Sequence, residues 1–361
     1  MIPSTYGAAL LLIVLSMLCW GSWANTFKLT PKWRFELFYY DFALGVLLAA
    51  VIAAYTFGSL GDEMSFSDNL LIAGKRNMAY GLAAGAIFNL ANILLVAAIS
   101  VAGLAVAFPI AIGLALVIGV IWNYILNPQG NVILLSVGVV LVIGAILVDA
   151  KAYSEHARAQ RRAAKTAIPT PDPASLRTRP KPSKPAGMST SAKGILLSLI
   201  SGVLMGSFYP LVELGKGGGL EAAGLGPYAI GFMFAIGVFL STFVYNLYFL
   251  NLPVEGEPVS PFVYFQGKFK QHALGILGGI IWCIGGLSNF VAASTPKEVQ
   301  VGPAISYAVG QGATMVSALW GVLVWKEFAG ATPQVTRLLI LMFVLFIAGL
   351  GLIALAPLYA K

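Results

Sequence analysis

The side chains able to do chemistry within the apolar parts of this chain are amides, hydroxyls and aromatic rings. Positions 77–148 contain no charged residue, and the polar groups near the middle of that stretch are Asn89 and Asn92. Their spacing of three places both amides on one face of a helix. Amides bind a neutral solute through hydrogen bonds, whereas a cationic solute would favour a deep carboxylate. We therefore expect a site for a neutral polar solute such as a ureide, a nucleobase or a sugar.

The candidate substrate-binding residues combine these amides with hydroxyls and aromatic rings at similar depth. Tyr307, Gln311 and Thr314 are spaced to share one helix face. Trp and Tyr rings can stack on a planar solute, and their alternative roles are packing and anchoring at the membrane interface. The alternative for the amides is interhelical hydrogen bonding, worth about 0.6 kcal/mol each. The predicted set is Trp23, Asn89, Asn92, Tyr209, Asn289, Tyr307, Gln311, Thr314 and Trp320, and the further aromatic residues considered for stacking include Trp20 and Trp282.

Few ionisable residues fall within the apolar stretches. Asp41 lies more than a turn inside one of them, which predicts a protonation switch. The alternative is an ion pair with Lys32 or Arg34 near the membrane surface. Glu213 is the second candidate for proton coupling. Asp149 is expected to be interfacial, at the membrane exit of its stretch.

The chain lacks the residue patterns of an enzyme or a metal protein. Its two cysteines, Cys19 and Cys283, lie inside apolar runs and are too few for a disulfide framework or a metal site. His156 and His272 are expected outside the spans, and no nucleophile and base pair is apparent. We therefore predict no catalytic residue, no metal and no cofactor. A primary pump would need a nucleotide-binding motif, which the sequence does not contain.

Composition identifies the surroundings that must position these residues. Hydrophobic residues make up 58% of the 361 positions and charged residues only 10%, against about 25% in soluble proteins. This balance argues against a soluble enzyme, a nucleic-acid binder and a disordered scaffold. A spanning helix needs about 20 apolar residues. Ten such stretches occur, near 6–25, 36–58, 77–100, 103–126, 132–149, 194–214, 227–250, 273–293, 302–325 and 337–357. The predicted fold class is an all-α polytopic membrane protein.

A basic, proline-rich segment divides the ten stretches into two groups of five. Residues 151–193 hold ten of the 22 Lys and Arg residues, so we predict repeats at 1–150 and 194–361 joined by a cytoplasmic linker. For the start of this linker a solvated tether is favoured over a basic helical stalk. The positive-inside rule then places 17 of the 22 basic residues in the cytoplasm and both termini outside. The expected location is a cell membrane, or the inner membrane of a Gram-negative bacterium.

The two groups of five resemble each other in order and spacing. Matching glycines are 185, 192, 194 and 205 positions apart, the pairs being Gly21 and Gly206, Gly45 and Gly237, Gly85 and Gly279, and Gly144 and Gly349. An offset that only rises is expected of duplication with small insertions. Because each half has an odd number of spans, the second copy must be inverted relative to the first. Inverted repeats can exchange conformations around a shared site, so transport is the expected function.

Short motifs along nearly the whole chain strengthen this interpretation. They are Gly21-Ser22-Trp23, Tyr40-Asp41-Phe42, Phe57-Gly58-Ser59-Leu60-Gly61, Asn92, Asn123-Tyr124, and Trp320-Gly321 followed by Glu327. In these motifs the chain resembles the ureide permease family of the drug/metabolite transporter superfamily, with the bacterial glucose/ribose porters as a related branch. The resemblance implies a ten-helix permease and proton-coupled uptake of allantoin-like or pyrimidine compounds. Plant members carry a phosphate-loop-like stretch in the central loop, and this chain has no Gly-x4-Gly-Lys there.

The function we expect is secondary transport of a small neutral polar metabolite, ureide-like or nucleobase-like, by alternating access. A sugar porter is an alternative within transport, and a non-transporting receptor or scaffold is an alternative of another class. The expected partners are the small-molecule solute, the lipid bilayer and protons, and a homodimer stays open. Nucleic acid is not an expected partner.

Overall fold

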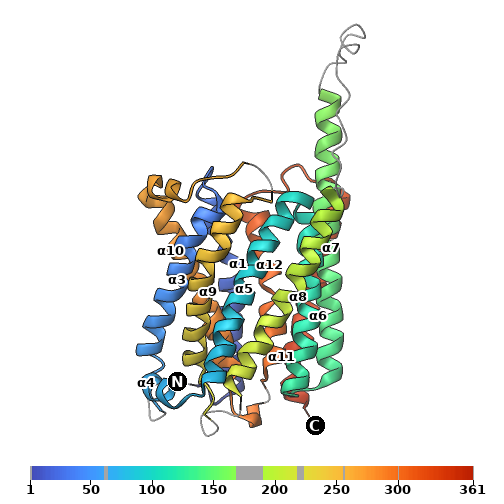
Figure 1. The fold of residues 1–361 in the computed structure, drawn as a ribbon. Helices are drawn as coiled ribbons and strands as arrows, with labels where there is room; N and C mark the ends of the chain where they lie inside the picture. Colours follow the sequence, from blue (N-terminus) through green and yellow to red (C-terminus); the bar gives the residue numbers. More distant parts are fainter. Residues whose placement is uncertain are drawn as a thin grey trace.

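The computed structural model describes residues 2–60, 64–167, 190–217, 223–254, 257–299 and 301–360. These residues form one bundle of helices, without strands in the described part of the chain (Figure 1). Ten helical segments among them are long and apolar enough to cross a bilayer, which confirms the predicted fold class. The helices of the first half are α1 (Tyr6–Ser22), α2 (Ala24–Lys28), α3 (Phe35–Tyr55), α4 (Phe66–Ile72), α5 (Lys75–Ala102), α6 (Leu104–Leu126) and α7 (Val132–Ala167). Those of the second half are α8 (Thr190–Lys216), α9 (Pro227–Asn251), α10 (Phe269–Ala292), α11 (Pro303–Gly310), α12 (Ala313–Leu319) and α13 (Pro333–Leu355).

The bundle has two distinct ends. Both chain termini lie at one end, which we call the terminal face (Figure 1). Helix α7 leaves the bundle at the opposite end, where α8 begins, and we call this end the linker face. Helices α1 and α8 therefore start from opposite faces and run in opposite directions.

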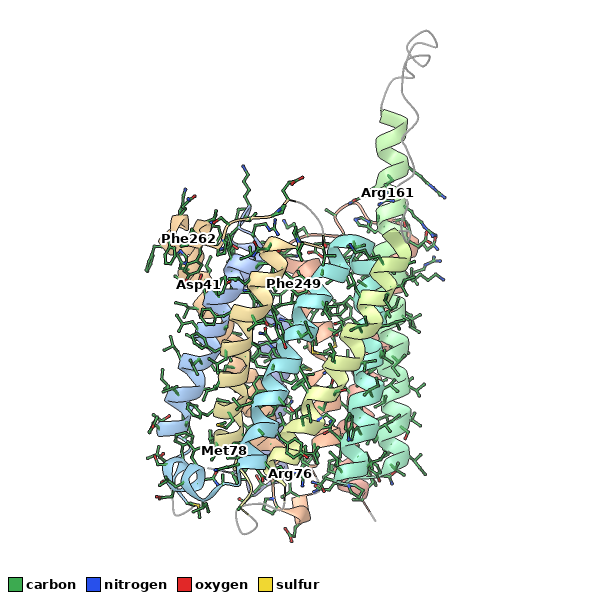
Figure 2. All side chains as sticks on the ribbon, viewed as in Figure 1. Asp41, Arg76, Met78, Arg161, Phe249 and Phe262 are labelled. Carbon is green, nitrogen blue, oxygen red and sulfur yellow. The ribbon has the colours of Figure 1, made fainter. Side chains whose placement is uncertain are left out.

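The linker begins as a helical stalk. Helix α7 continues as far as Ala167 and projects beyond the linker face, where Figure 2 marks Arg161. The preference for a solvated tether was therefore wrong for residues 151–167. This segment is rich in Ala, Arg and Lys, which are strong helix formers, and the first proline follows only at position 169. The predicted linker residues 168–189 lie outside the described residues.

Two interfaces bring helices together at glycines. A Cβ atom on Gly45 of α3 would lie 2.1 Å from the Ile276 carbonyl oxygen of α10, and one on Gly237 of α9 would lie 2.2 Å from the Leu82 carbonyl oxygen of α5. Gly279 and Gly85 repeat the arrangement, each with its Cβ position 2.0 Å from a carbonyl oxygen, of Phe42 and Phe234 respectively. No larger side chain fits at this distance. The α3–α10 and α9–α5 interfaces thus have the same construction, at the offsets of 192 and 194 residues found in the sequence.

The ninth span is broken in the middle. Helix α11 ends at Gly310, helix α12 starts at Ala313, and a five-residue π-helix follows at Trp320–Val324. The turn falls between Tyr307 and Thr314, so the single face expected of Tyr307, Gln311 and Thr314 stays a prediction. Gly310 and Gly312 flank the break, and glycine is a poor helix former.

Candidate functional site

Asn289 is the centre of a buried polar cluster that joins four helices. Its side-chain oxygen accepts hydrogen bonds from Tyr209 Oη of α8 at 2.7 Å and from Ser306 Oγ of α11 at 2.8 Å. Its Nδ2 donates to Ser16 Oγ of α1 at 3.0 Å and to the Ser306 carbonyl oxygen at 3.1 Å. Asn289 is fully buried, so this amide holds elements of both halves together in apolar surroundings.

Aromatic rings surround the cluster. Tyr307 lies beside Tyr209, with ring centroids 5.2 Å apart, and its hydroxyl donates to the Ala115 carbonyl oxygen at 3.3 Å. Trp20 stacks on Trp282 at 5.9 Å, and a Cβ on Gly310 would lie 2.8 Å from the Trp20 ring and 2.9 Å from Asn289 Nδ2. The indole N–H of Trp20 is buried and has no hydrogen-bond partner among the described residues. Buried donors are almost always satisfied, so this unpaired N–H is unusual, and Trp20 lines neither of the two cavities described below.

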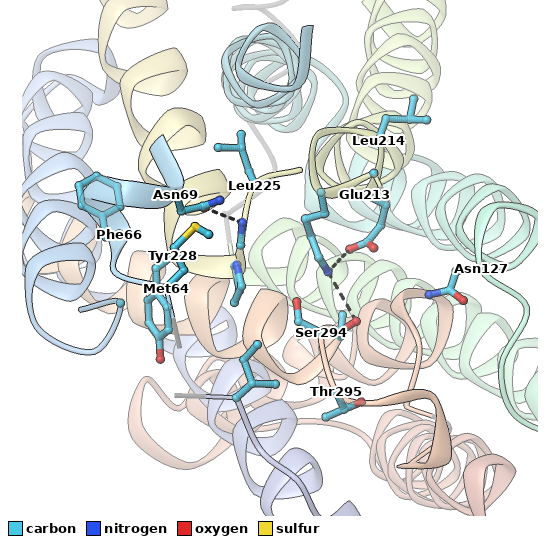
Figure 3. A pocket seen from close by; sticks show the side chains of 18 of the residues that line it. Met64, Phe66, Asn69, Asn127, Glu213, Leu214, Leu225, Tyr228, Ser294 and Thr295 are labelled. Carbon is cyan, nitrogen blue, oxygen red and sulfur yellow. Dashed lines mark hydrogen bonds and ion pairs between the residues drawn. The ribbon is translucent and has the colours of Figure 1, made fainter. Parts of the chain in front are cut away.

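A cavity of about 680 Å³ opens at the terminal face (Figure 3). Its polar lining includes Glu213, Lys216, Ser294 and Thr295, together with Asn69, Asn127, Gln129 and Tyr228. The volume lies within the range of small-molecule sites.

An ion pair lines the cavity. Lys216 Nζ is 2.8 Å from Glu213 Oε1 and 3.5 Å from the carbonyl oxygen of Ala293. Glu213 follows Tyr209 by four residues on α8, and Ala293 follows Asn289 by four at the end of α10. This part of the cavity lining is therefore about one helical turn from the Asn289 cluster.

The two amides first considered for substrate binding lie in other helix contacts. Asn89 Nδ2 on α5 donates to Ser241 Oγ at 2.7 Å and Thr242 Oγ1 at 3.0 Å on α9. Asn92 Nδ2 donates to Tyr39 Oη on α3 at 3.0 Å. Neither lines the cavity at the terminal face. Their hydrogen bonds match the interhelical alternative, and a role in solute binding stays a prediction.

The other predicted residues lie on the linker side of the cluster. Trp23 packs against Phe42 at 4.8 Å, and Trp320 Nε1 donates to Ser22 Oγ at 2.9 Å. Gln311 lies in the turn after α11, and Thr314 lines a small separate cavity. Of the nine predicted substrate residues, the structure thus brings together Tyr209, Asn289 and Tyr307.

Asp41 lies in a hydrogen-bonded cluster near the linker face, where Figure 2 labels it. Tyr264 Oη donates to Asp41 Oδ1 at 2.6 Å, and His272 Nδ1 is 2.8 Å from Oδ2. Burial and the hydrogen bond to Asp41 raise the pKa of Tyr264 far above its ordinary value, so Tyr264 stays a donor at neutral pH. Arg34 pairs with Glu36 at 2.5 Å and not with Asp41, so the predicted alternative partner was wrong.

The histidine partner was missed because α10 begins earlier than expected. His272 was placed outside the spans, but it lies in the first turn of α10, and the short 3-10 helix Pro261–Gln266 brings Tyr264 to the same place. Helix α10 also approaches Asp41 closely at Gly275, three residues after His272, because a Cβ on Gly275 would lie 2.4 Å from the Cβ of Asp41. No group of three or more His, Cys, Asp or Glu side chains is arranged for a metal within the described ranges.

Comparison with known proteins now identifies the family. The ureide permease family model matches residues 38–178 and 182–356. Ureide permease 1 and ureide permease 2 of Arabidopsis thaliana are 24% and 23% identical to the chain, and each alignment covers 96% of both proteins. Transmembrane protein 144 homolog B of Dictyostelium discoideum is 29% identical over 45% of this chain and 40% of its own. One solved crystal structure, 15% identical, has a TM-score of 0.59 over 96% of both chains and so shares the fold.

These matches agree with the ten spans and with the resemblance seen in the motifs. Members of this family are transporters and not enzymes, which confirms the expectation that the chain is not an enzyme. The chain belongs to the ureide permease family and is a multi-pass membrane transporter.

Proposed function

We propose that this protein transports a small neutral ureide, with allantoin as the model solute. The observation that carries the proposal is the uncharged cluster of Asn289, Tyr209 and Ser306 beside the unpaired indole N–H of Trp20. A ureide presents several N–H donors and carbonyl acceptors in a nearly planar group. An amide offers both partners for such groups, the indole offers a donor, and the Trp20–Trp282 stack offers a flat apolar wall.

The family supports a ureide over the alternatives. Ureide permeases match this chain over nearly its whole length, which favours a ureide over the sugar alternative. They also favour transport over a receptor or scaffold.

The proposed mechanism is alternating access between two inverted halves, 1–150 and 194–361. The matching glycine contacts of α3–α10 and α9–α5 support this division. The larger cavity opens at the terminal face, whereas the cavity near the linker face measures only about 50 Å³. By the positive-inside rule the terminal face is external, so this arrangement corresponds to an outward-open state. The proposal includes proton coupling through Asp41 and Glu213. Asp41 contacts His272 and Glu213 contacts Lys216, so each carboxylate has a basic side chain beside it with which a proton can be exchanged.

A thermal-shift screen of the purified protein tests the proposal. The solutes are allantoin, uracil, glucose, ribose and a cationic dye, because a ligand that binds only the folded state stabilises it. At 100 times the dissociation constant the gain is about 2.7 kcal/mol, which raises the melting temperature by several degrees. Stabilisation by allantoin that Asn289→Ala abolishes supports the proposal. A response to the sugars alone would overturn it.

A further inference from the structure

Asp149 is a buried carboxylate without a compensating partner. Its side chain is 7% exposed, and Oδ1 has no hydrogen-bond partner in the part of the chain that the structure describes. Helix α7 continues for another 18 residues beyond Asp149 and packs against α13 and α6, and the expected interfacial position of Asp149 stays a prediction. An ionised carboxylate in such a place is strongly unfavourable unless something neutralises it.

The free carboxylate oxygen belongs to a residue that lines a small cavity. A cavity of about 50 Å³ lies between α6, α7 and α12, and its polar lining consists of Asp149, Tyr153, Thr314 and Ser317. This volume is sufficient for a single water molecule or a small ion. Carboxylate and hydroxyl oxygens are the ligands that hard cations prefer.

No cationic side chain of the described residues compensates Asp149. Tyr153, one turn further along α7, donates to Glu327 Oε2 at 2.7 Å, so a second carboxylate lies nearby and makes the surroundings more negative. Lys28 is hydrogen-bonded to the other oxygen of Glu327. On neighbouring elements Lys151, Lys326 and Arg337 are exposed, as are Arg158, Arg161 and Arg162 further along α7, and the buried His156 is two turns from Asp149 and contacts Gln160. The neutralising charge must therefore come from outside the protein.

We propose that the Asp149 cavity binds a small monovalent cation, either a proton on the carboxylate or Na⁺ held by Asp149, Thr314 and Ser317. Hydrogen bonds join Lys28 to Glu327 and Glu327 to Tyr153, and Tyr153 lines the cavity.

The cavity also bridges the two halves of the protein. Asp149 belongs to the first half, whereas Thr314 is the second residue of α12, directly after the turn that ends α11. Helix α11 carries Ser306 and Tyr307 of the Asn289 cluster. Filling the cavity fixes α12 against α7 and so biases the position of the turn. This coupling to solute binding rests on the proposed transport function, whereas the cation site itself does not.

The test uses the purified full-length protein, the isosteric variant Asp149→Asn, and Asp68→Asn as a matched control that removes an exposed carboxylate. Melting temperature is measured at constant ionic strength while choline is replaced by Na⁺, and separately as a function of pH without Na⁺. A cation that binds only the folded state raises the melting temperature by about 2 °C for each tenfold increase in its concentration above the dissociation constant. A proton that binds only the folded state stabilises it in the same way, so the melting temperature falls as the pH rises and the proton concentration drops.

The wild type and Asp68→Asn should respond alike, and Asp149→Asn should lose the response. A response to Na⁺ at fixed pH identifies Na⁺ as the occupant, and a response to pH alone identifies the proton. Equal responses of wild type and Asp149→Asn, or no response to either cation in the wild type, would overturn the site. If Asp149→Asn fails to fold, Thr314→Val and Ser317→Ala replace it in the test, because both keep the carboxylate. The affinity of these two variants for Na⁺ should fall about tenfold. Their response to pH through Asp149 should not change. Allantoin binding is measured on the same samples, so failure of the ureide proposal is distinguishable from failure of the cation site.

Discussion

Replacing Asn289 by alanine should weaken both the fold and solute binding. The change removes four hydrogen bonds, two accepted from Tyr209 and Ser306 and two donated to Ser16 and the Ser306 carbonyl. Interhelical hydrogen bonds in membranes contribute about 0.6 kcal/mol each, so we expect a loss of about 2 kcal/mol in the free energy of unfolding. If the amide also contacts the solute, the affinity should fall at least tenfold, which corresponds to about 1.4 kcal/mol.

Asn89→Ala is the matched control for this prediction. Asn89 is equally buried and donates three hydrogen bonds to α9. Neither amide lines the cavity at the terminal face, but Ala293, one turn after Asn289, does, whereas none of the described residues that line this cavity belongs to α5. Replacement of Asn89 should therefore cost a similar stability and leave solute affinity unchanged. Unfolding in mixed detergent measures the first quantity, and calorimetric titration with allantoin measures the second. Equal affinities of the wild type and Asn289→Ala would refute the placement of the solute at this cluster, as would an equal loss in both variants.

Three further predictions concern the glycine contacts and the acidic residues. Gly279→Ala should lower the free energy of unfolding by about 1–3 kcal/mol, because the added methyl meets the Phe42 carbonyl, whereas Gly113→Ala, with open space around it, should be neutral or stabilising in the same unfolding assay. Asp41→Asn should abolish uptake driven by a pH gradient while preserving solute exchange in proteoliposomes, and full gradient-driven uptake would remove Asp41 from the mechanism. Burial alone would raise the pKa of Glu327, but hydrogen bonds from a lysine and a tyrosine hold it below its ordinary value of 4.5. Its stabilising effect is therefore complete above pH 4.5 and is lost as the pH falls further, so the melting temperature of the wild type should decline more steeply there than that of Glu327→Gln; parallel curves would contradict this assignment.

The spans and part of the candidate site were predictable because the bilayer limits the sequence so strongly. Long apolar stretches give the ten helices directly. A polar residue inside such a stretch must find a partner in the bundle, which is why Asn289, Tyr209 and Tyr307 could be identified as buried polar residues. The spacing of residues in the sequence could not distinguish an amide that lies near a cavity, such as Asn289, from one that only links helices, such as Asn89.

The ionisable clusters were less predictable because their members are far apart in the chain. Asp41 and His272 are 231 positions apart, and the start of α10 decides whether they meet. The burial of Asp149 depends in the same way on the packing of α7 against helices that are distant in the sequence. Helix boundaries are the least reliable part of a sequence-based prediction, and the missed contact of Asp41 with His272 arose from one of them.

The most direct test of the proposed function is uptake of labelled allantoin into proteoliposomes that contain the purified protein. With an inward proton gradient, uptake should exceed that of empty liposomes, be inhibited by excess unlabelled allantoin but not by glucose, and be lost in Asn289→Ala. Uptake no greater than in empty liposomes, by protein that is folded and correctly inserted, would contradict the conclusion that this transporter carries a ureide.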